Sequence, residues 1–143
     1  MNDSATSDGA YVGSKMYKET IPAIVAALQK VLGNHLLARR VKLANSTDGN
    51  HSNASAYYTV YTNLLCERQI WGKSTYENSY DVGDDTTALP GFSNYKNNIY
   101  DPSYFWPRSV FNGNDFVSAR SGGSVGYADT RASYGVRPLI TIG

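Results

Sequence analysis

The side chains of this chain that could do chemistry are few and lie apart in the sequence. His35 and His51 do not belong to a spaced set of metal ligands. Asp81, Asp84 and Asp85 form an acidic group whose oxygens could bind a hard cation. Because the group lacks the spacing and the terminal Glu of an EF-hand loop, a solvated loop is the better interpretation, and no metal is expected.

Catalytic motifs are missing from the sequence. No serine stands in a nucleophile elbow, no motif is centred on a histidine, and no phosphate-binding loop occurs. Cys66 is the only cysteine, so an internal disulfide is excluded. Its apolar neighbours Leu64 and Leu65 favour a buried and inert thiol. We therefore expect a protein that is not an enzyme and that has no cofactor.

The net charge and the lengths of the apolar segments exclude some classes of binding partner. The formal net charge is +1, and the nearest approach to a basic stripe is Arg39-Arg40, so nucleic acid is not expected as a partner. No apolar run approaches the roughly 18 residues of a membrane span, so no membrane insertion is expected.

The length of the chain fits one domain with its own core. A chain of 143 residues can bury a sizeable apolar core. Residues 1–10 are small and polar and lack the basic and apolar regions of a signal peptide. We expect them to form a flexible tail or a fragment junction, and residues 11–143 to form a single domain.

The periodicity of the apolar residues predicts an α+β domain. Apolar side chains between Ile21 and Leu32 recur at helical spacing, which indicates one amphipathic helix over 17–33. Thr20 is the expected N-cap, and Gly33 the expected stop. Strands are predicted at 35–43, 57–61, 104–110, 115–119, 124–128 and 135–142.

The segments between these elements complete the predicted architecture. A polar loop is expected over 45–55 and a short helix over 63–71. Residues 72–102 show no periodicity, but their aromatic side chains favour an ordered excursion over disorder. The sequence thus predicts a helix packed on small antiparallel sheets, with a long irregular loop region.

The C-terminal part of the chain has an unusual composition. After Trp106 the chain contains no Lys, Glu, Gln, Met or Trp, although these types make up about one residue in seven before it. What remains is mostly Tyr, Ser, Gly, Asn, Asp, Arg and Thr, a composition typical of binding surfaces. Arg108 and Arg137 flank this stretch and are interpreted as scaffold residues, since a buried arginine needs carboxylate or carbonyl partners.

Several short motifs, taken in their order along the chain, resemble a known family. They cover nearly the whole chain after the first ten residues, and they are Tyr11-Val12-Gly13-Ser14, Gly33-Asn34-His35-Leu36-Leu37, Leu64-Leu65-Cys66-Glu67, Trp71-Gly72, Tyr80-Asp81-Val82-Gly83, Leu89-Pro90, Trp106-Pro107-Arg108, Gly122-Gly123 and Gly135-Val136-Arg137-Pro138. Together they resemble the C-type-lectin-like fold of phage and gut-bacterial proteins, among them the variable proteins of diversity-generating retroelements.

The resemblance implies a function and a genetic origin. In such variable proteins a reverse transcriptase rewrites adenines in a repeat near the C-terminus, and the fold displays the altered residues as a ligand-binding face. The codons that are diversified cannot yield Lys, Glu, Gln, Met or Trp, which are the five types missing after Trp106. A β-rich and Gly-rich end would also be poor in these types, and that simpler explanation stays open.

Departures from the family pattern limit what the resemblance implies. Pro107 stands where the family often has an aliphatic residue, and a proline there requires a strand edge or a bulge. Asn112-Gly113-Asn114-Asp115 is only distantly similar to the Trp-Asn-Asp triplet of sugar-binding members, so calcium-dependent sugar binding is not implied. The sulfatase-activating relatives depend on cysteine chemistry that Cys66 alone does not supply.

The resemblance places a variable face between Ser109 and Tyr134. Aromatic side chains would anchor it, because they carry much of the binding energy of interfaces. The residues expected to frame the face are Trp106, Arg108, Gly135, Arg137 and Pro138. The expected contact residues are Ser109, Phe111, Asn112, Asn114, Ser118, Arg120, Tyr127, Asp129, Arg131, Ser133 and Tyr134.

The expected protein is a receptor-binding display domain on a phage particle, diversified by a retroelement, with a host-surface protein or glycan as partner. Its location would be the virion surface or, alternatively, a bacterial cell surface, and a homo-oligomer through a parent virion protein is compatible with this. Two other hypotheses remain open. One is an invariant structural module of a virion or cell surface, and the other is a degenerate enzyme of the sulfatase-activating type.

Overall fold

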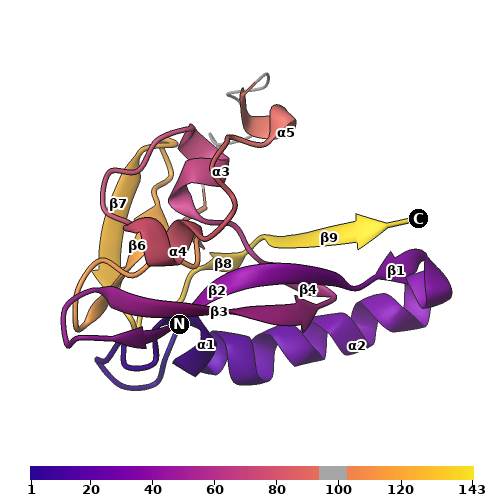
Figure 1. The fold of residues 1–143 in the computed structure, drawn as a ribbon, viewed down its shortest axis with the longest axis horizontal. Helices are drawn as coiled ribbons and strands as arrows, with labels where there is room; N and C mark the ends of the chain where they lie inside the picture. The colour runs from indigo at the N-terminus through magenta and orange to yellow at the C-terminus, as the bar shows by residue number, and fades with distance from the viewer. Residues whose placement is uncertain (94–102) are drawn as a thin grey trace.

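The described part of the molecule consists of two small sheets, a two-stranded ribbon, several short helices and one longer helix (Figure 1). The structure is a computed structural model that describes residues 1–93 and 103–143. It confirms the mixed α+β class that the periodicity predicts. Residues 94–102 of the expected irregular region lie outside the described residues.

The helices and strands are short apart from α2 and the ribbon. The helical segments are α1 (Ala10–Gly13), the π-helical turn η1 (Met16–Thr20), α2 (Ile21–Leu32), the 3₁₀ turn η2 (Gly33–His35), α3 (Glu67–Trp71), α4 (Ser79–Val82) and α5 (Pro90–Ser93). The strands are β1 (Leu36–Leu37), β2 (Arg39–Thr47), β3 (Ser52–Val60), β4 (Thr62–Leu64), β5 (Phe105–Trp106), β6 (Asp115–Ala119), β7 (Val125–Asp129), β8 (Gly135–Val136) and β9 (Pro138–Ile142).

One end of the molecule is an arm, which we define as α2 and the three-stranded sheet β1-β9-β4. The strand β9 is central, and it pairs antiparallel with β1 and with β4. In Figure 1 the arm extends to the right, and α2 runs along the lower edge of the molecule. Gly33 ends α2 with a positive φ of 53°, the backbone region that favours glycine, so the predicted stop is confirmed.

The other end is the body, which we define as the four-stranded sheet β7-β6-β5-β8 with α3 and α4. The β5–β8 pair is parallel, and the β5–β6 and β6–β7 pairs are antiparallel. Trp106 and Phe105 in β5 belong to two different apolar clusters, one on each side of the sheet. The sheet of the body is therefore covered on both faces.

A long hairpin, β2 paired with β3, connects the two ends and corrects one prediction. The polar loop expected over 45–55 is wrong for most of its length, since only residues 48–51 lie between the paired strands. Ser46 still pairs with Ala54, and the register shifts beside it. Polar side chains with little strand propensity are held in strand geometry here by the ladder of backbone hydrogen bonds to the partner strand.

The start of the long helix also differs from the prediction. The π-helical turn η1 leads directly into α2, so Thr20 has helical dihedral angles and its side chain caps nothing. Pro22 lies in the first turn of α2, where a missing backbone N–H costs little. The expected N-cap at Thr20 is therefore wrong, because the chain is already helical before it.

Two further segments differ in detail from the predicted elements. The short helix expected over 63–71 divides into β4 and α3, and regular structure occurs in the region expected to be irregular as α4 and α5. The side chain of Asn78 caps α4 by accepting from the backbone N–H groups of Tyr80 and Asp81. Pro107 follows directly after the last residue of β5, so it interrupts no strand.

The first ten residues, expected to form a flexible tail, pack against the C-terminal half of the chain. Ser7 is buried, and it donates from its backbone N–H to the Gly113 carbonyl at 2.8 Å and from its hydroxyl to the Asn112 carbonyl at 2.7 Å. The hydroxyl of Thr130 donates to the Ser4 carbonyl at 2.6 Å. These long-range hydrogen bonds order a segment whose composition alone suggests no structure.

Candidate functional site

Arg108 occupies the interior of the body and joins three segments of the chain. Its side chain is 1% exposed. The guanidinium donates to the backbone carbonyls of Leu64, Asp81 and Val82, to the side-chain oxygen of Gln69, and to the carboxylate of Asp85 at 2.9 Å. The residue thus lies where a scaffold role requires it, with an oxygen partner for each donor group that is buried.

The acidic group Asp81, Asp84 and Asp85 is not a shared cation site in this structure. Asp81 is buried and accepts from the Ser52 hydroxyl at 2.6 Å. Asp84 accepts from the Tyr57 hydroxyl, and Asp85 pairs with Arg108. The expected solvated loop is wrong for Asp81, because this residue belongs to helix α4, which turns its carboxylate into the interior, where burial raises its pKa to about 6.

Two buried glutamates, Glu67 and Glu77, each accept hydrogen bonds from the backbone around the other. The Glu67 carboxylate accepts from the backbone N–H groups of Thr75, Tyr76 and Glu77. The Glu77 carboxylate in turn accepts from the N–H groups of Glu67 and Arg68, at 2.8 and 2.7 Å. Burial raises the pKa of Glu77. The pair closes the loop after α3 and fixes the position of Tyr76.

Three aromatic side chains from separate segments meet on the body, and we call Tyr76, Phe111 and Tyr127 the aromatic face. The rings of Phe111 and Tyr127 are stacked, with centroids 4.0 Å apart. Tyr76 meets both rings edge-on, at 5.0 and 5.6 Å. Tyr127 remains 44% exposed. The group therefore offers solvent a rigid aromatic surface whose members hold one another in place.

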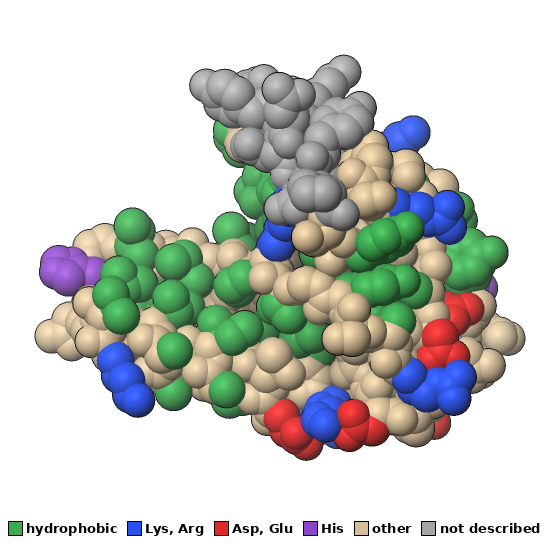
Figure 2. All heavy atoms as spheres, turned by 180° about the vertical axis from the view of Figure 1, so that it is seen from behind, with side chains coloured by type: hydrophobic (Ala, Val, Ile, Leu, Met, Phe, Trp, Pro, Cys, Tyr) green, Lys and Arg blue, Asp and Glu red, His purple; other side chains and the backbone are tan. Residues whose placement is uncertain are grey.

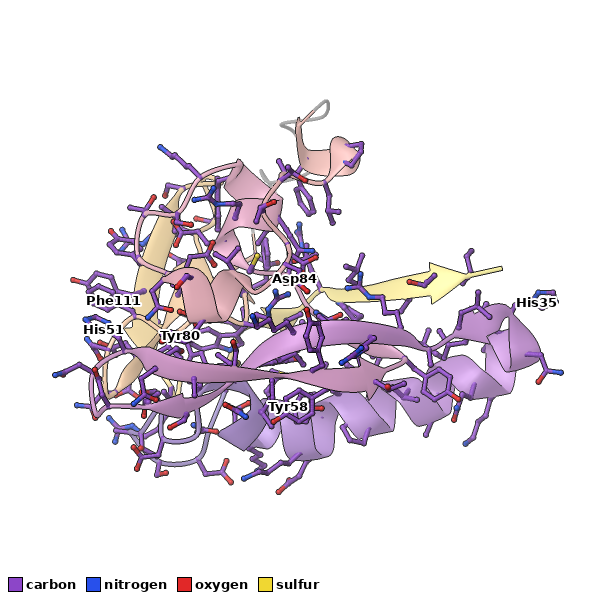
Figure 3. All side chains as sticks on the ribbon, viewed as in Figure 1. His35, His51, Tyr58, Tyr80, Asp84 and Phe111 are labelled. Carbon is purple, nitrogen blue, oxygen red and sulfur yellow. The ribbon has the colours of Figure 1, made fainter. Side chains whose placement is uncertain are left out.

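The aromatic face lies at the end of the molecule opposite the arm. Figure 3 shows Phe111 at one end together with His51 and Tyr80, while His35 marks the tip of the arm at the other end. The β2–β3 turn is a neighbour, because a side chain at Gly113 would meet the carbonyl oxygen of Gly49.

Tyr134, the other expected tyrosine anchor, belongs to a different group. Its ring is stacked on Tyr104 at 5.0 Å and lies 4.7 Å from Trp106. Ala128 and Tyr134 both pack against the core cluster that contains Trp106. Tyr127 precedes Ala128 in β7, and consecutive strand residues point to opposite faces. Tyr127 and Tyr134 therefore lie on opposite sides of the sheet and cannot form one flat contact surface.

Two of the expected contact residues, Ser109 and Ser118, are buried. Ser109 is 0% exposed and Ser118 is 1% exposed. The hydroxyl of Ser109 donates to the Glu77 carboxylate and accepts from the backbone N–H of Glu67 at 3.2 Å. Ser109 therefore supports the loop that carries Tyr76 and has no surface for a ligand.

Three further expected contact residues, Asn112, Asn114 and Arg120, shape loops or stay exposed. Asn112 accepts from the backbone N–H groups of Asn114 and Asp115, both at 2.9 Å, so its side chain builds the turn before β6. Asn114 is exposed. Arg120 is also exposed, and its guanidinium lies over Gly126, so a larger residue at Gly126 would displace it.

Arg131 and Ser133 lie on the Tyr134 side, and Arg131 reaches Asp129 at the end of β7. Asp129 and Arg131 form a two-pronged ion pair, with oxygen–nitrogen distances of 2.9 and 2.7 Å. The hydrogen bonds from Arg131 lower the pKa of Asp129 to about 2. Arg131, Ser133 and Tyr134 line a cavity of about 280 Å³ together with residues of the N-terminal segment, including Asp3 and Lys15.

The other residues expected to frame the face lie in the body sheet or in the chain that leads from it into the arm. Trp106 is 1% exposed in the core. Gly135 pairs with Phe105 in the parallel pair of strands, and its N–H donates to the Tyr104 carbonyl at 2.9 Å. The guanidinium of Arg137 lies 4.2 Å from the Phe105 ring centroid. Pro138 opens β9 opposite Leu64.

Chemistry of other kinds finds no support in the described residues. Across 1–93 and 103–143, no three His, Cys, Asp or Glu side chains are grouped so that they could hold a metal ion. Cys66 is buried, and burial raises the pKa of its thiol to about 12. In the same ranges no helix has the length and apolar character needed to cross a membrane.

Sequence reasoning missed Tyr76 as a member of the aromatic face. It lies in the region without periodicity, and its position depends on hydrogen bonds to Glu67, eight to ten residues earlier along the chain. The aromatic content of that region was the available signal, but it indicated order without indicating which ring would meet Phe111 or Tyr127.

Comparisons with protein-family models, with curated proteins and with solved structures found no significant match to this chain.

Proposed function

We propose that this chain is a C-type-lectin-like ligand-binding domain and that it binds through the aromatic face. The observation that carries the proposal is the group of Tyr76, Phe111 and Tyr127, three rings from separate segments in mutual contact, of which Tyr127 is exposed and the other two are half-buried. Aromatic side chains fixed before binding lose little entropy when a ligand is bound, so they are efficient anchors. The face is smaller than the one expected from the sequence.

The composition of the segment supports a variable version of this face. Phe111 and Tyr127, and the exposed residues Asn114 and Arg120 of the same segment, are all types that a diversified Asn codon can yield. Tyr76 lies before the segment without Lys, Glu, Gln, Met and Trp, so it would be the constant member. We propose a phage particle as the setting, a bacterial cell surface as the alternative, and a host-surface protein or glycan as the ligand.

The DNA around the gene tests the diversification. We expect a near-copy of the codons for about 104–138, with adenines wherever the gene differs from the copy, and a reverse-transcriptase gene nearby. An identical C-terminal segment in sibling genomes, without such a copy, would contradict the proposal and favour an invariant structural module.

Binding is tested with the fluorescently labelled domain on a panel of intact bacterial strains, measured by flow cytometry. Removing a central interface aromatic costs about 2 kcal/mol or more, so Tyr127→Ala and Phe111→Ala should each weaken binding about thirtyfold. Tyr57→Ala is the matched control, since Tyr57 is 48% exposed outside the face. Protease or periodate treatment of the cells then distinguishes a protein ligand from a glycan.

An unchanged signal for both aromatic variants would contradict binding through this face. Thermal unfolding of the same variants is the necessary companion measurement. Tyr127 contacts two other rings, so its removal should destabilise the fold by about 1 kcal/mol, which leaves the domain folded at room temperature.

A further inference from the structure

The outer side of α2 is an uncovered helix face at the edge of the molecule. In Figure 1 the helix runs along the lower edge, with the arm's strands on its inner side. Ile21 is buried, and Ile24, Val25 and Leu28 are half-buried towards the sheet. The exposed residues of the helix are Pro22, Ala23, Ala26, Ala27, Gln29, Lys30 and Val31.

Apolar surface continues around this helix. Val31 is 83% exposed, and Leu37 and Ile142 at the tip of the arm are 41% and 62% exposed. A groove of about 300 Å³ runs between α2 and Tyr61. On the face drawn in Figure 2, many apolar side chains lie on the arm among uncharged polar surface, with few charged side chains between them. Apolar patches of this kind mark interaction surfaces in soluble proteins.

The few charges on the outer face of α2 are arranged so that the face complements a second copy of itself. Glu19, whose side chain is 68% exposed, lies in the π-helical turn η1 that leads directly into α2, and Lys30 lies near the end of α2. The two are eleven residues apart, close to three helical turns, so they share one side of the helix. Between Ile21 and Leu32, Lys30 is the only charged side chain.

An antiparallel copy of the helix brings opposite charges together twice. When Ala23 lies opposite Ala26 of the second copy, Glu19 lies opposite Lys30 of that copy, and the same contact repeats on the other side of the two-fold axis. A parallel copy would place like charges together. The alanines at the centre let the two helices approach closely, to roughly 8 Å between their axes.

The intrahelical alternative for Glu19 is weak. Its carboxylate lies 4.0 Å from the Lys15 ammonium, whereas Lys15 lies 2.6 Å from Asp3. Glu19 is thus free enough to bind a cation on another molecule. The macrodipoles of two antiparallel helices also oppose each other favourably.

We propose that the outer face of α2 is a two-fold interface between copies of this chain, in which the two helices pack antiparallel. This interface does not depend on the proposed ligand. It lies away from the aromatic face, as the positions of Phe111 and His35 at opposite ends show (Figure 3). A dimer of this kind would carry two aromatic faces and would gain avidity for a surface with repeated ligands.

Charge reversal tests the register of the interface by sedimentation velocity, from about 1 µM to about 200 µM protein. Glu19→Lys and Lys30→Glu each convert two attractive contacts into two repulsive ones, so each should weaken dimerisation about tenfold at low salt. The double variant Glu19→Lys/Lys30→Glu exchanges the charges and should restore the affinity of the wild type. Lys73→Glu, an exposed change outside the arm, is the matched control and should have no effect.

Steric disruption of the interface is the second test. Ala26→Arg places a long side chain at the centre of the interface and should yield a monomer, while circular dichroism checks that the helix content is retained. A wild type that sediments as a monomer at about 200 µM would overturn the proposal. The proposal would also be overturned if the Ala26→Arg variant dimerised as tightly as the wild type. The same holds if the double charge reversal did not recover the affinity lost in the single variants.

Discussion

The body and the arm of this molecule are stabilised by different forces. In the body, the charged side chains Arg108, Glu67 and Glu77 are buried and surrounded by directional hydrogen bonds. In the arm, α2 lies on a three-stranded sheet through apolar contacts, and much of its apolar surface remains exposed. Directional bonds fix positions, whereas apolar contacts are non-directional and scale with the area buried.

The difference indicates which end suits which task. The aromatic face rests on the hydrogen-bonded end, where a carboxylate holds the backbone of Tyr76 in place. The arm ends in exposed apolar side chains that another molecule can cover. A preformed binding site suits the hydrogen-bonded body, and a surface for association with another molecule suits the apolar arm.

The largest effect is expected from breaking the network of the body at Arg108. Arg108→Met removes the guanidinium hydrogen bonds to three backbone carbonyls, to Gln69 and to Asp85, and should lower the free energy of unfolding by about 3–5 kcal/mol. Urea unfolding measures the change. Arg40→Met, which removes an exposed guanidinium 4.2 Å from the Tyr57 ring, is the control and should cost less than about 1 kcal/mol. Equal losses for both would show that burial of the network adds nothing.

The buried carboxylate of Asp81 should make the body more stable as the pH falls. Burial raises its pKa to about 6 in the folded state, so the folded protein takes up a proton before the unfolded chain does. Stability should rise as the pH falls through about 6, by about 2 kcal/mol by pH 4.5. Glu77 shifts in the same direction.

Asp81→Asn tests this by removing the titrating group. Denaturant unfolding between about pH 7 and about pH 4.5 should show a smaller gain in the variant than in the wild type. A wild type whose stability falls steadily over this range would contradict a raised pKa at Asp81.

A moderate effect is expected in the arm. Ile24 is half-buried against the core, so Ile24→Ala should lower the free energy of unfolding by about 1–2 kcal/mol, less than a fully buried isoleucine. The same urea titration applies. If Ile24→Ala lowers the free energy of unfolding as much as Arg108→Met does, the two ends depend equally on their interior side chains. The proposed difference between the arm and the body would then be wrong.

The smallest effect is expected at the surface of the body. Arg131→Ala breaks the ion pair with Asp129, which is solvent-exposed on both sides. The melting temperature near pH 7 should stay within measurement error, because exposed pairs contribute little. Asp129 has a lowered pKa of about 2, so any contribution of the pair would be lost only as the pH falls from about 4 to about 2.

The sequence was informative where local pattern decides the structure. The strand predicted at 115–119 matches β6, and the apolar periodicity located the helix that becomes α2. It failed where distant partners decide. Residues 45–55 read as a loop because their side chains are polar, yet backbone pairing across the hairpin makes most of them strand.

The candidate site shows the same limit. Tyr127 and Tyr134 are only seven residues apart, in a segment of uniform composition. They nevertheless belong to groups on opposite sides of the sheet. Ser109 has the residue type of a contact surface, but it is bonded to Glu77, thirty-two residues earlier in the chain. Composition identifies the segment, whereas the direction of each side chain depends on strand pairing that no local signal contains.

The burial of Cys66 has a practical consequence for work with this protein. It is the only cysteine, and burial raises its thiol pKa to about 12, so the reactive thiolate is scarcely present near neutral pH. Thiol-directed reagents should therefore leave the natural chain unmodified. A cysteine introduced at an exposed position such as Ser121 would accept a single fluorophore or surface linker, at a point chosen by the experimenter and without removing any native residue from the interior.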